Sequence, residues 1–265
     1  MSGNFHTHTV FCDGADTAED MVLAAIDMGM DEIGFSGHAY TPFDISWCMT
    51  PETTERYIAE VRRLSEKYSD KIKVYCGIEA DFYSEFDASR FDYVIGSVHY
   101  VEKGGVYYPI DESADLIKNA ADMAWGGDIY AFIEDYYALE ARIAEVTGAD
   151  IIGHFDLIAK FNEKQPLFDE SDPRYVAAAK AAADALIKSG VPFEINTGAM
   201  SRGWRSVPYP SESLMHYIAE HGGEFILSSD SHSKTTLDYG FDEAVRIAER
   251  AGVTVESFHY ILHKN

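Results

Sequence analysis

Short apolar runs alternate with longer segments of helical periodicity along the whole chain, and this alternation constrains the fold more than any other feature. It predicts parallel β-strands joined by crossover helices. Several of the runs are apolar on both faces, as strands of a buried parallel sheet must be. We predict seven strands, centred on residues 4–6, 32–36, 73–78, 93–97, 150–153, 192–195 and 224–227.

Capping residues mark the ends of several predicted helices between these strands. Thr17, with Asp20 three residues later, is typical of a helix start, and Gly29 marks the end of the same helix. Two further helices are predicted over residues 176–188 and 211–221, and each is followed closely by a glycine.

No internal repeat, low-complexity tract or Pro/Gly/Ser-rich linker divides the 265 residues. We therefore expect an α/β fold with a single domain over residues 1–265, in which seven β/α units close into one barrel. The segment 111–146 is longer than a normal crossover. It predicts two helices, broken near Gly126 and Gly127, that could cover one end of the barrel.

Histidines and carboxylates recur where the predicted strands end. Parallel strands in an α/β barrel direct the loops that follow them to one face, so groups far apart in sequence meet there. Six of the ten histidines occupy such positions: His6, His8, His38, His99, His154 and His232. Four carboxylates do the same: Asp13, Glu79, Asp156 and Asp230.

This set of side chains predicts a metal centre. Histidine with Asp or Glu, and without cysteine, is the ligand set of Zn²⁺, Mn²⁺ or Fe²⁺. One ion takes only about four to six ligands, so we expect two or three ions. Three divalent ions would contribute about +6 against the −3 of Asp13, Glu79 and Asp230, and such a site attracts a phosphate.

Composition narrows the possible partners and location. The formal net charge of −24 disfavours binding to nucleic acid or to an anionic membrane. Three cysteines without a CxxC pair fit a reducing compartment, and no apolar run is long enough to span a bilayer. We expect a cytoplasmic protein that acts on a small molecule.

Taken singly, each motif has an ordinary structural explanation. His38, His99 or His154 could be a hydrogen-bonded core histidine, and the sequences around His6 and His232 are short and common. Their shared position at strand ends favours the metal centre. His259 and His263 are four residues apart but lack the glutamate of an HExxH motif, so we expect them on a solvated helical face.

Seven ordered motifs resemble those of the PHP (polymerase and histidinol phosphatase) superfamily, and within it those of the histidinol-phosphatases. The similarity covers nearly the whole chain. It lies in residues 5–9 with Asp13, and in residues 34–39, 77–81, 93–99, 152–158, 194–197 and 229–232.

The resemblance implies a distorted, TIM-like (β/α)₇ barrel with a trinuclear metal centre. In the family pattern His6, His8, Glu79 and Asp230 hold one ion, Glu79 also holds a second with His99 and His154, and Asp13, His38 and His232 hold the third. Glu79, Asp230 and His232 would be catalytic, and a metal-bound hydroxide would attack phosphorus. Arg202, with Arg205 nearby, and Lys160 would contact the phosphate. Asp156 would either orient a ligand histidine or contact a substrate amine.

The implied activity is hydrolysis of L-histidinol phosphate to L-histidinol and phosphate in histidine biosynthesis. Two alternatives stay open at this point. One is a related phosphoesterase that acts on another small phosphate ester or a nucleotide. The other is a non-enzymatic metal-binding protein.

Overall fold

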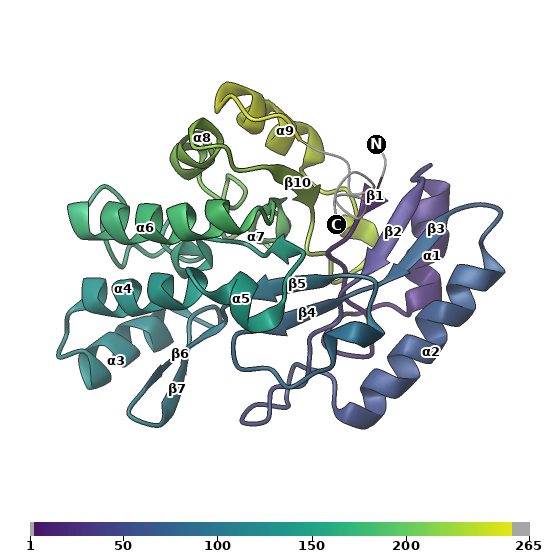
Figure 1. Ribbon diagram of the computed structural model, residues 1–265, viewed down its shortest axis with the longest axis horizontal. Helices are drawn as coiled ribbons and strands as arrows, with labels where there is room; N and C mark the ends of the chain where they lie inside the picture. Colours follow the sequence, from purple (N-terminus) through teal and green to yellow (C-terminus); the bar gives the residue numbers. More distant parts are fainter. Residues whose placement is uncertain (1–2, 256–265) are drawn as a thin grey trace.

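Two parallel sheets, covered by helices, form the framework of the computed structural model, which describes residues 3–255 (Figure 1). The strands are β1 (Gly3–Asn4), β2 (Glu32–Phe35), β3 (Lys73–Cys76), β4 (Ile78–Asp81), β5 (Val94–Ser97), β6 (Tyr100–Lys103), β7 (Val106–Pro109), β8 (Ile151–Ile152), β9 (Phe193–Asn196) and β10 (Phe225–Ser228). The α-helices are α1 (Ala18–Asp27), α2 (Pro51–Lys67), α3 (Ala114–Ala124), α4 (Ile129–Glu140), α5 (Ile143–Thr147), α6 (Pro173–Ser189), α7 (Gly198–Ser201), α8 (Glu212–Glu220) and α9 (Phe241–Arg250). Three short 3₁₀ helices are η1 (Ala88–Arg90), η2 (Leu157–Ala159) and η3 (Lys234–Thr236).

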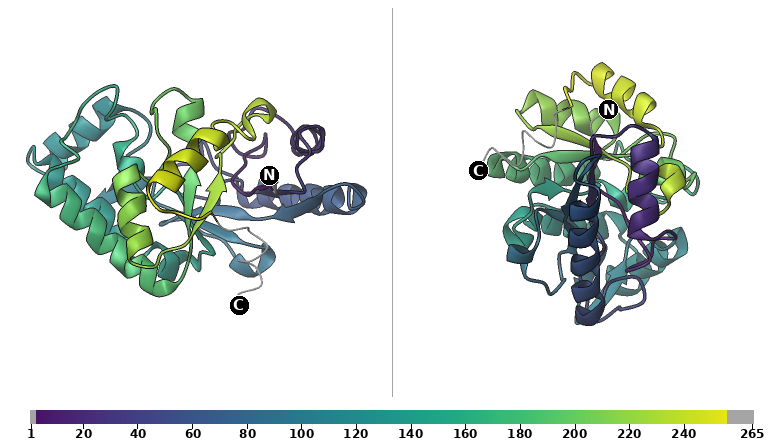
Figure 2. Two further views of the ribbon diagram at one scale, coloured as in Figure 1. Left: turned by 90° about the horizontal axis from the view of Figure 1, so that it is seen from above. Right: turned by 90° about the vertical axis from the view of Figure 1, so that its right-hand side faces the viewer.

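Parallel pairing runs through both large sheets. One has the order β1-β2-β3 and the other β10-β9-β8-β5-β4. Single parallel bridges join Thr7 to Ser231 and His38 to Glu79 beyond the strand ends. Figure 2 shows the N-terminal segment (purple) beside the segment after β10 (yellow). The predicted α/β class with parallel strands is confirmed, and a strand lies in each of the seven predicted regions.

The predicted third strand, 73–78, was wrong in one respect: it is interrupted at Gly77. β3 before the interruption pairs with β2, whereas β4 after it pairs with β5, so the chain passes from one sheet to the other. A Cβ atom at Gly77 would lie 2.2 Å from the ring of Tyr93. The Tyr93 hydroxyl donates to the carbonyls of Phe5, at 2.5 Å, and Phe35, at 3.1 Å. A side chain at position 77 would displace a ring that ties three strands together.

The region from 100 to 147 also differs from the prediction. β6 and β7 form an antiparallel hairpin that we did not predict, and three helices follow where two were expected. The break between α3 and α4 does fall at Gly126 and Gly127, which have φ values of 64° and 84°. The Gly104-Gly105 dipeptide was a signal for this hairpin in the sequence, because two-residue hairpin turns favour glycine. Both residues adopt positive φ in the structure.

Three groups of buried apolar side chains hold the layers together. α1 and α2 pack beside β2 and β3, while α3, α4, α6, α8 and α9 pack around the second sheet (Figure 1). The third group lies between the sheets and consists of Phe5, Tyr93, Ile95, Ile151 and Ile226. Its members come from strands, or strand ends, that are far apart in the sequence, so the two sheets share a core.

The predicted helix signals at Thr17, Gly29 and Gly190 are confirmed, whereas α6 begins at Pro173, three residues before the predicted start. The Thr17 side chain accepts a hydrogen bond from the Asp20 amide, and Gly29 and Gly190 adopt left-handed conformations after α1 and α6. His259 and His263 lie outside the described residues. Among residues 3–255 we find no helix with the length and apolar character that crossing a bilayer requires.

The contact between Gly77 and Tyr93 gives a test of the fold. Gly77→Ala should lower the free energy of unfolding by about 1–3 kcal/mol, because the added methyl group overpacks the Tyr93 ring. Urea denaturation followed by circular dichroism measures this change. An unchanged midpoint would show that the strands can separate at this position without cost.

Candidate metal centre

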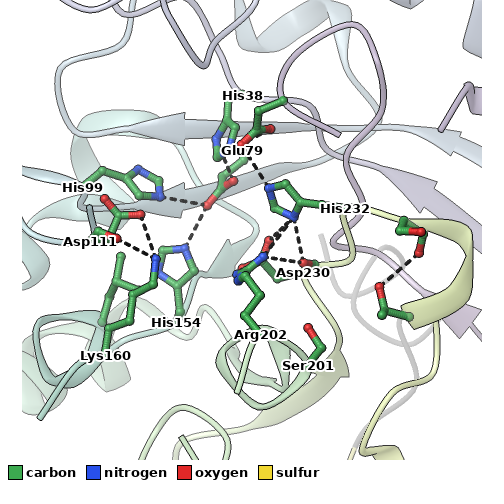
Figure 3. Close-up of a pocket in the computed structure, with 14 residues that line it drawn as sticks. His38, Glu79, His99, Asp111, His154, Lys160, Ser201, Arg202, Asp230 and His232 are labelled. Atoms are coloured by element: carbon green, nitrogen blue, oxygen red, sulfur yellow. Dashed lines mark hydrogen bonds and ion pairs between the residues drawn. The ribbon is translucent and has the colours of Figure 1, made fainter. Parts of the chain in front are cut away.

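All six histidines of the predicted centre, and three of the four carboxylates, gather in one cluster beyond the carboxyl ends of the strands. His38, His99, His154 and His232 line a pocket together with the three carboxylates (Figure 3), whereas His6 and His8 lie in the same cluster but do not line the pocket. His6 and His8 follow β1, His38 follows β2, His99 follows β5, His154 follows β8 and His232 follows β10. Glu79 projects from β4 and Asp230 follows β10, while Asp13 lies in the loop after β1. The strand-end argument therefore located these nine side chains correctly.

Glu79 is the centre of the cluster. One oxygen, Oε2, lies 2.9 Å from His38 Nδ1, 3.1 Å from His6 Nε2 and 3.4 Å from His8 Nε2. The other, Oε1, lies 3.0 Å from His154 Nε2 and 3.5 Å from His99 Nε2. Five imidazoles thus surround a carboxylate that is only 1% exposed.

The other two carboxylates extend the cluster toward the opening of the pocket. Asp230 Oδ1 lies 3.2 Å from His8 Nε2, and Asp13 Oδ2 lies 3.1 Å from His232 Nε2. Asp230 is the one non-glycine among the described residues with positive φ, at 48°. Strained backbone of this kind is concentrated at functional sites.

Several of the facing atoms have no hydrogen-bonding partner among the described residues. They are buried and include His6 Nε2, His8 Nε2, His38 Nδ1 and Glu79 Oε2. These nitrogens lie close to Glu79 Oε2, but their geometry does not form hydrogen bonds with it. Burying lone pairs in this way is costly unless an electrophile occupies the space between them. The residues therefore fit divalent cations. The cluster contains four groups of three or four side chains, and within each group the ligand atoms all lie within 4.8 Å of one another.

Electrostatics at the cluster also favours positive charge. Burial acts to raise the pKa of Glu79, but the imidazoles of His6 and His38 outweigh it, so the pKa lies well below its usual value. Burial acts to lower the pKa of His6, yet Glu194, Glu79 and Asp230 raise it well above the ordinary range. The carboxylates stay ionised and require cations beside them.

Outer carboxylates fix the orientation of two of the histidines. Glu194, on β9, accepts a hydrogen bond from His6 Nδ1 at 2.9 Å, which leaves His6 Nε2 directed at Glu79. Asp81 Oδ2 accepts from the His99 amide and lies 3.5 Å from His99 Nδ1. Sequence reasoning missed these roles, although Glu194 and Asp81 lie within motifs that it singled out.

Two cationic side chains line the same pocket, whose volume is about 380 Å³. Arg202 donates from Nη2 to Asp230 Oδ2 at 2.7 Å, and its Nη1 lies 3.1 Å from His232 Nδ1. A Cβ atom at Gly198 would lie within 2.8 Å of both Arg202 and Asp230, so glycine is needed for this approach. Lys160 donates to the carbonyl of Asp111 at 2.7 Å.

Asp156 and Arg205 do not line this pocket. They are 0% and 6% exposed, and Arg205 Nη1 lies 3.4 Å from Asp156 Oδ2. Asp156 also accepts from the Ser211 amide, and Arg205 lies over the ring of Tyr209. This position does not support the predicted contacts with substrate. Instead, the buried ion pair between Asp156 and Arg205, with the hydrogen bond from the Ser211 amide, anchors the segment that leads into α8.

Two further residues at or beside the pocket were missed, one after the unpredicted hairpin and one in the loop before α2. Asp111 follows β7 and lines the pocket. Trp47 lies in the loop before α2, and its ring centroid is 4.6 Å from that of His38. The Gly104–Gly105 turn signal would have led to Asp111, whereas nothing in the local sequence marks Trp47.

Comparisons with known proteins agree with this geometry. Residues 4–198 match the family described as PHP domain. The chain is similar to a Deinococcus radiodurans protein named "Probable histidinol-phosphatase", with 32% identity over 96% of this chain and 95% of that protein. It is 28% identical to the histidinol-phosphatase of Lactococcus lactis, over 94% of this chain and 91% of that one.

A solved structure shares the fold. It is the Lactococcus lactis histidinol phosphate phosphatase in complex with zinc, L-histidinol and phosphate. The TM-score is 0.73 with 20% sequence identity, and the alignment covers 96% of this chain and 95% of that one.

The contacts of Glu194 yield a test of the centre. Its carboxylate accepts hydrogen bonds from His6 Nδ1, the His154 backbone amide, Asn196 Nδ2 and Ser228 Oγ. A glutamine at this position would place its own NH₂ donor against some of these donors, and those hydrogen bonds would be lost. Glu194→Gln should weaken zinc binding by about 10- to 100-fold, measured by competition with a chromogenic chelator.

Glu140→Gln is the matched control, because Glu140 is equally buried but bonds Tyr136 rather than a histidine of the centre. Equal loss in both variants, or none in Glu194→Gln, would contradict the positioning role of Glu194.

Proposed function

The chain belongs to the PHP domain family, and we propose that it is a metal-dependent phosphomonoesterase that hydrolyses L-histidinol phosphate to L-histidinol and phosphate. The convergence of nine imidazole and carboxylate side chains beside two cationic side chains carries the proposal. The choice of substrate follows the relatives, which are named as histidinol-phosphatases.

The centre would hold two or three divalent ions, of zinc, manganese or iron. One set is His6, His8, Glu79 and Asp230; a second is Glu79, His99 and His154; a third is Asp13, His38 and His232. Support comes from the short distances from Glu79 to His6, His8, His99 and His154, from Asp230 to His8, and from Asp13 to His38 and His232. The buried atoms that lack partners give further support. When bound, such ions generate a nucleophile from water at neutral pH and stabilise charge on the transferring phosphoryl group.

The chain's own side chains would bind and orient the phosphate. Arg202, whose side chain is 34% exposed, keeps part of its guanidinium open to the pocket while Asp230 holds the rest. The Lys160 ammonium lies across the same pocket. Both attract a phosphate into a protein whose overall charge of −24 would repel it. Glu79, Asp230 and His232 are the groups proposed to contact the ions and the reacting water.

The finer description of the fold is also a proposal. We propose that the two sheets act as one distorted seven-unit barrel, within a single domain. The bridge between Thr7 and Ser231, and the continuous path from β3 to β4, support this reading.

We place the enzyme in histidine biosynthesis in the cytoplasm, acting on a small molecule rather than on nucleic acid. The acidic charge and the modest volume of the pocket support this placement.

A substrate panel tests the function. The purified protein should release phosphate from L-histidinol phosphate with a higher kcat/KM than from p-nitrophenyl phosphate, glycerol phosphate or nucleoside monophosphates. Dialysis against a chelator should abolish turnover, and divalent metal should restore it. Equal or better activity on a nucleotide would reject the substrate, and metal binding without any turnover would reject the enzyme.

The phosphate contact is tested separately. Arg202→Met should lower kcat/KM by about 10- to 100-fold, because it removes a charge-assisted hydrogen bond to the phosphate. Arg246→Met removes the same charge from an exposed site on α9 and should have no comparable effect. Phosphate release assays on both variants measure the effect. Equal losses of kcat/KM in the two variants would attribute the effect to the net charge of the protein and would contradict a direct contact between Arg202 and the phosphate.

A further inference from the structure

A second hollow opens from the metal pocket and is assigned no role by the proposed chemistry. This hollow, which we call the annex, has a volume of about 230 Å³. It shares four lining residues with the metal pocket, namely Asp13, His38, His99 and Asp111. The others are Ser46, Trp47, Tyr100 and Glu112. A molecule with its phosphate at the metal centre could therefore extend into the annex.

One wall of the annex is aromatic and held in place. Trp47 Nε1 donates to the Tyr100 hydroxyl at 2.9 Å, and that hydroxyl donates to Asp44 Oδ2 at 2.8 Å. The loop that carries Trp47 is also joined to the β6–β7 hairpin, since Phe43 stacks on Tyr107 with ring centroids 3.7 Å apart. The wall is thus preorganised for a flat ring, at little entropic cost on binding.

The charge of the annex is opposite to that of the phosphate end. Partial burial raises the pKa of Glu112, and the neighbouring carboxylates of Asp111 and Asp44 raise it further, while Lys160 acts in the opposite direction. Lys160 lies 3.5 Å from Asp111 Oδ2. Within residues 3–255, Glu112 has no basic side chain at ion-pair distance. The annex therefore presents a carboxylate without a direct ion-pair partner among the described residues, beside aromatic rings.

We propose that the annex binds the organic cation of the substrate, with Glu112 receiving its ammonium group and Trp47 its heteroaromatic ring. This inference rests on the proposed function and makes Glu112 and Trp47 specificity-determining residues. A carboxylate pairs with an ammonium group, and an aromatic face attracts a cation or stacks on a flat ring.

The two ends of the site together select for a zwitterion. Arg202 and Lys160 attract the phosphate, whereas Glu112 and Asp111 attract positive charge at the far end. A sugar phosphate or a nucleotide would leave the Glu112 carboxylate unpaired, or would place a second anion near it. Specificity here would come from the favourable contact, which these molecules lack, and from repulsion between Glu112 and a second anion.

Glu112→Gln gives the direct test, because this side chain is exposed and its replacement should not disturb folding. The measured quantity is the ratio of kcat/KM for L-histidinol phosphate to kcat/KM for p-nitrophenyl phosphate, which lacks an ammonium group. We expect the ratio to fall by about 10- to 100-fold, mainly through KM for L-histidinol phosphate. Glu249→Gln, which removes an exposed carboxylate from α9, is the matched control and should keep the ratio.

Calorimetry of L-histidinol binding to the zinc-loaded protein tests the annex assignment separately from the proposed phosphatase activity. We expect Glu112→Gln and Trp47→Leu each to weaken this binding by at least about 10-fold, with Trp47→Phe closer to the wild type. An unchanged ratio with unchanged L-histidinol affinity would overturn the annex assignment and leave the phosphatase intact. Tight L-histidinol binding that depends on Glu112, without hydrolysis of L-histidinol phosphate, would support the annex and reject the proposed reaction.

Discussion

A carboxylate buried among five imidazoles is the constraint on which the rest of the structure depends. Glu79 is 1% exposed and its two oxygens divide the histidines between them. An isolated ion in such a place would be strongly destabilising, so the fold must provide compensating positive charge. It does so by ending strands of both sheets at the same point, which requires the chain to cross between the sheets at Gly77, two residues before Glu79.

An acidic surface is compatible with a pocket that admits a phosphate, because surface charges and pocket charges act over different ranges. Exposed charges farther apart than about 8 Å are screened at physiological ionic strength, whereas charges within a pocket are screened much less. Arg202 and Lys160 therefore act on a phosphate at short range inside the pocket, where the distant acidic residues of the surface contribute little. Net charge excludes large polyanions without excluding a small phosphate ester.

The sequence was sufficient to predict which imidazole and carboxylate side chains converge, but not what surrounds them. His6, His38 and Asp230 could be placed because a parallel sheet brings strand ends together whatever the intervening loops do. Asp156 follows β8 in the same way, yet its side chain turns into the protein and pairs with Arg205. Position along a strand determines the end of the sheet that a residue reaches. The direction of its side chain depends on packing that no local pattern records.

The same difference explains why the annex was not predicted. The lining that it does not share with the metal pocket comes from the loop before α2 and from the hairpin region, which are insertions between units of the regular alternation rather than parts of it. Strand ends must keep their geometry to retain the metal ligands, whereas inserted loops can change without disturbing the sheet. A division follows in which the regular fold supplies the reactive groups and the insertions decide which phosphate ester reaches them. Trp47 and Glu112 belong to that second class, and only the three-dimensional arrangement brings them beside His38 and His99.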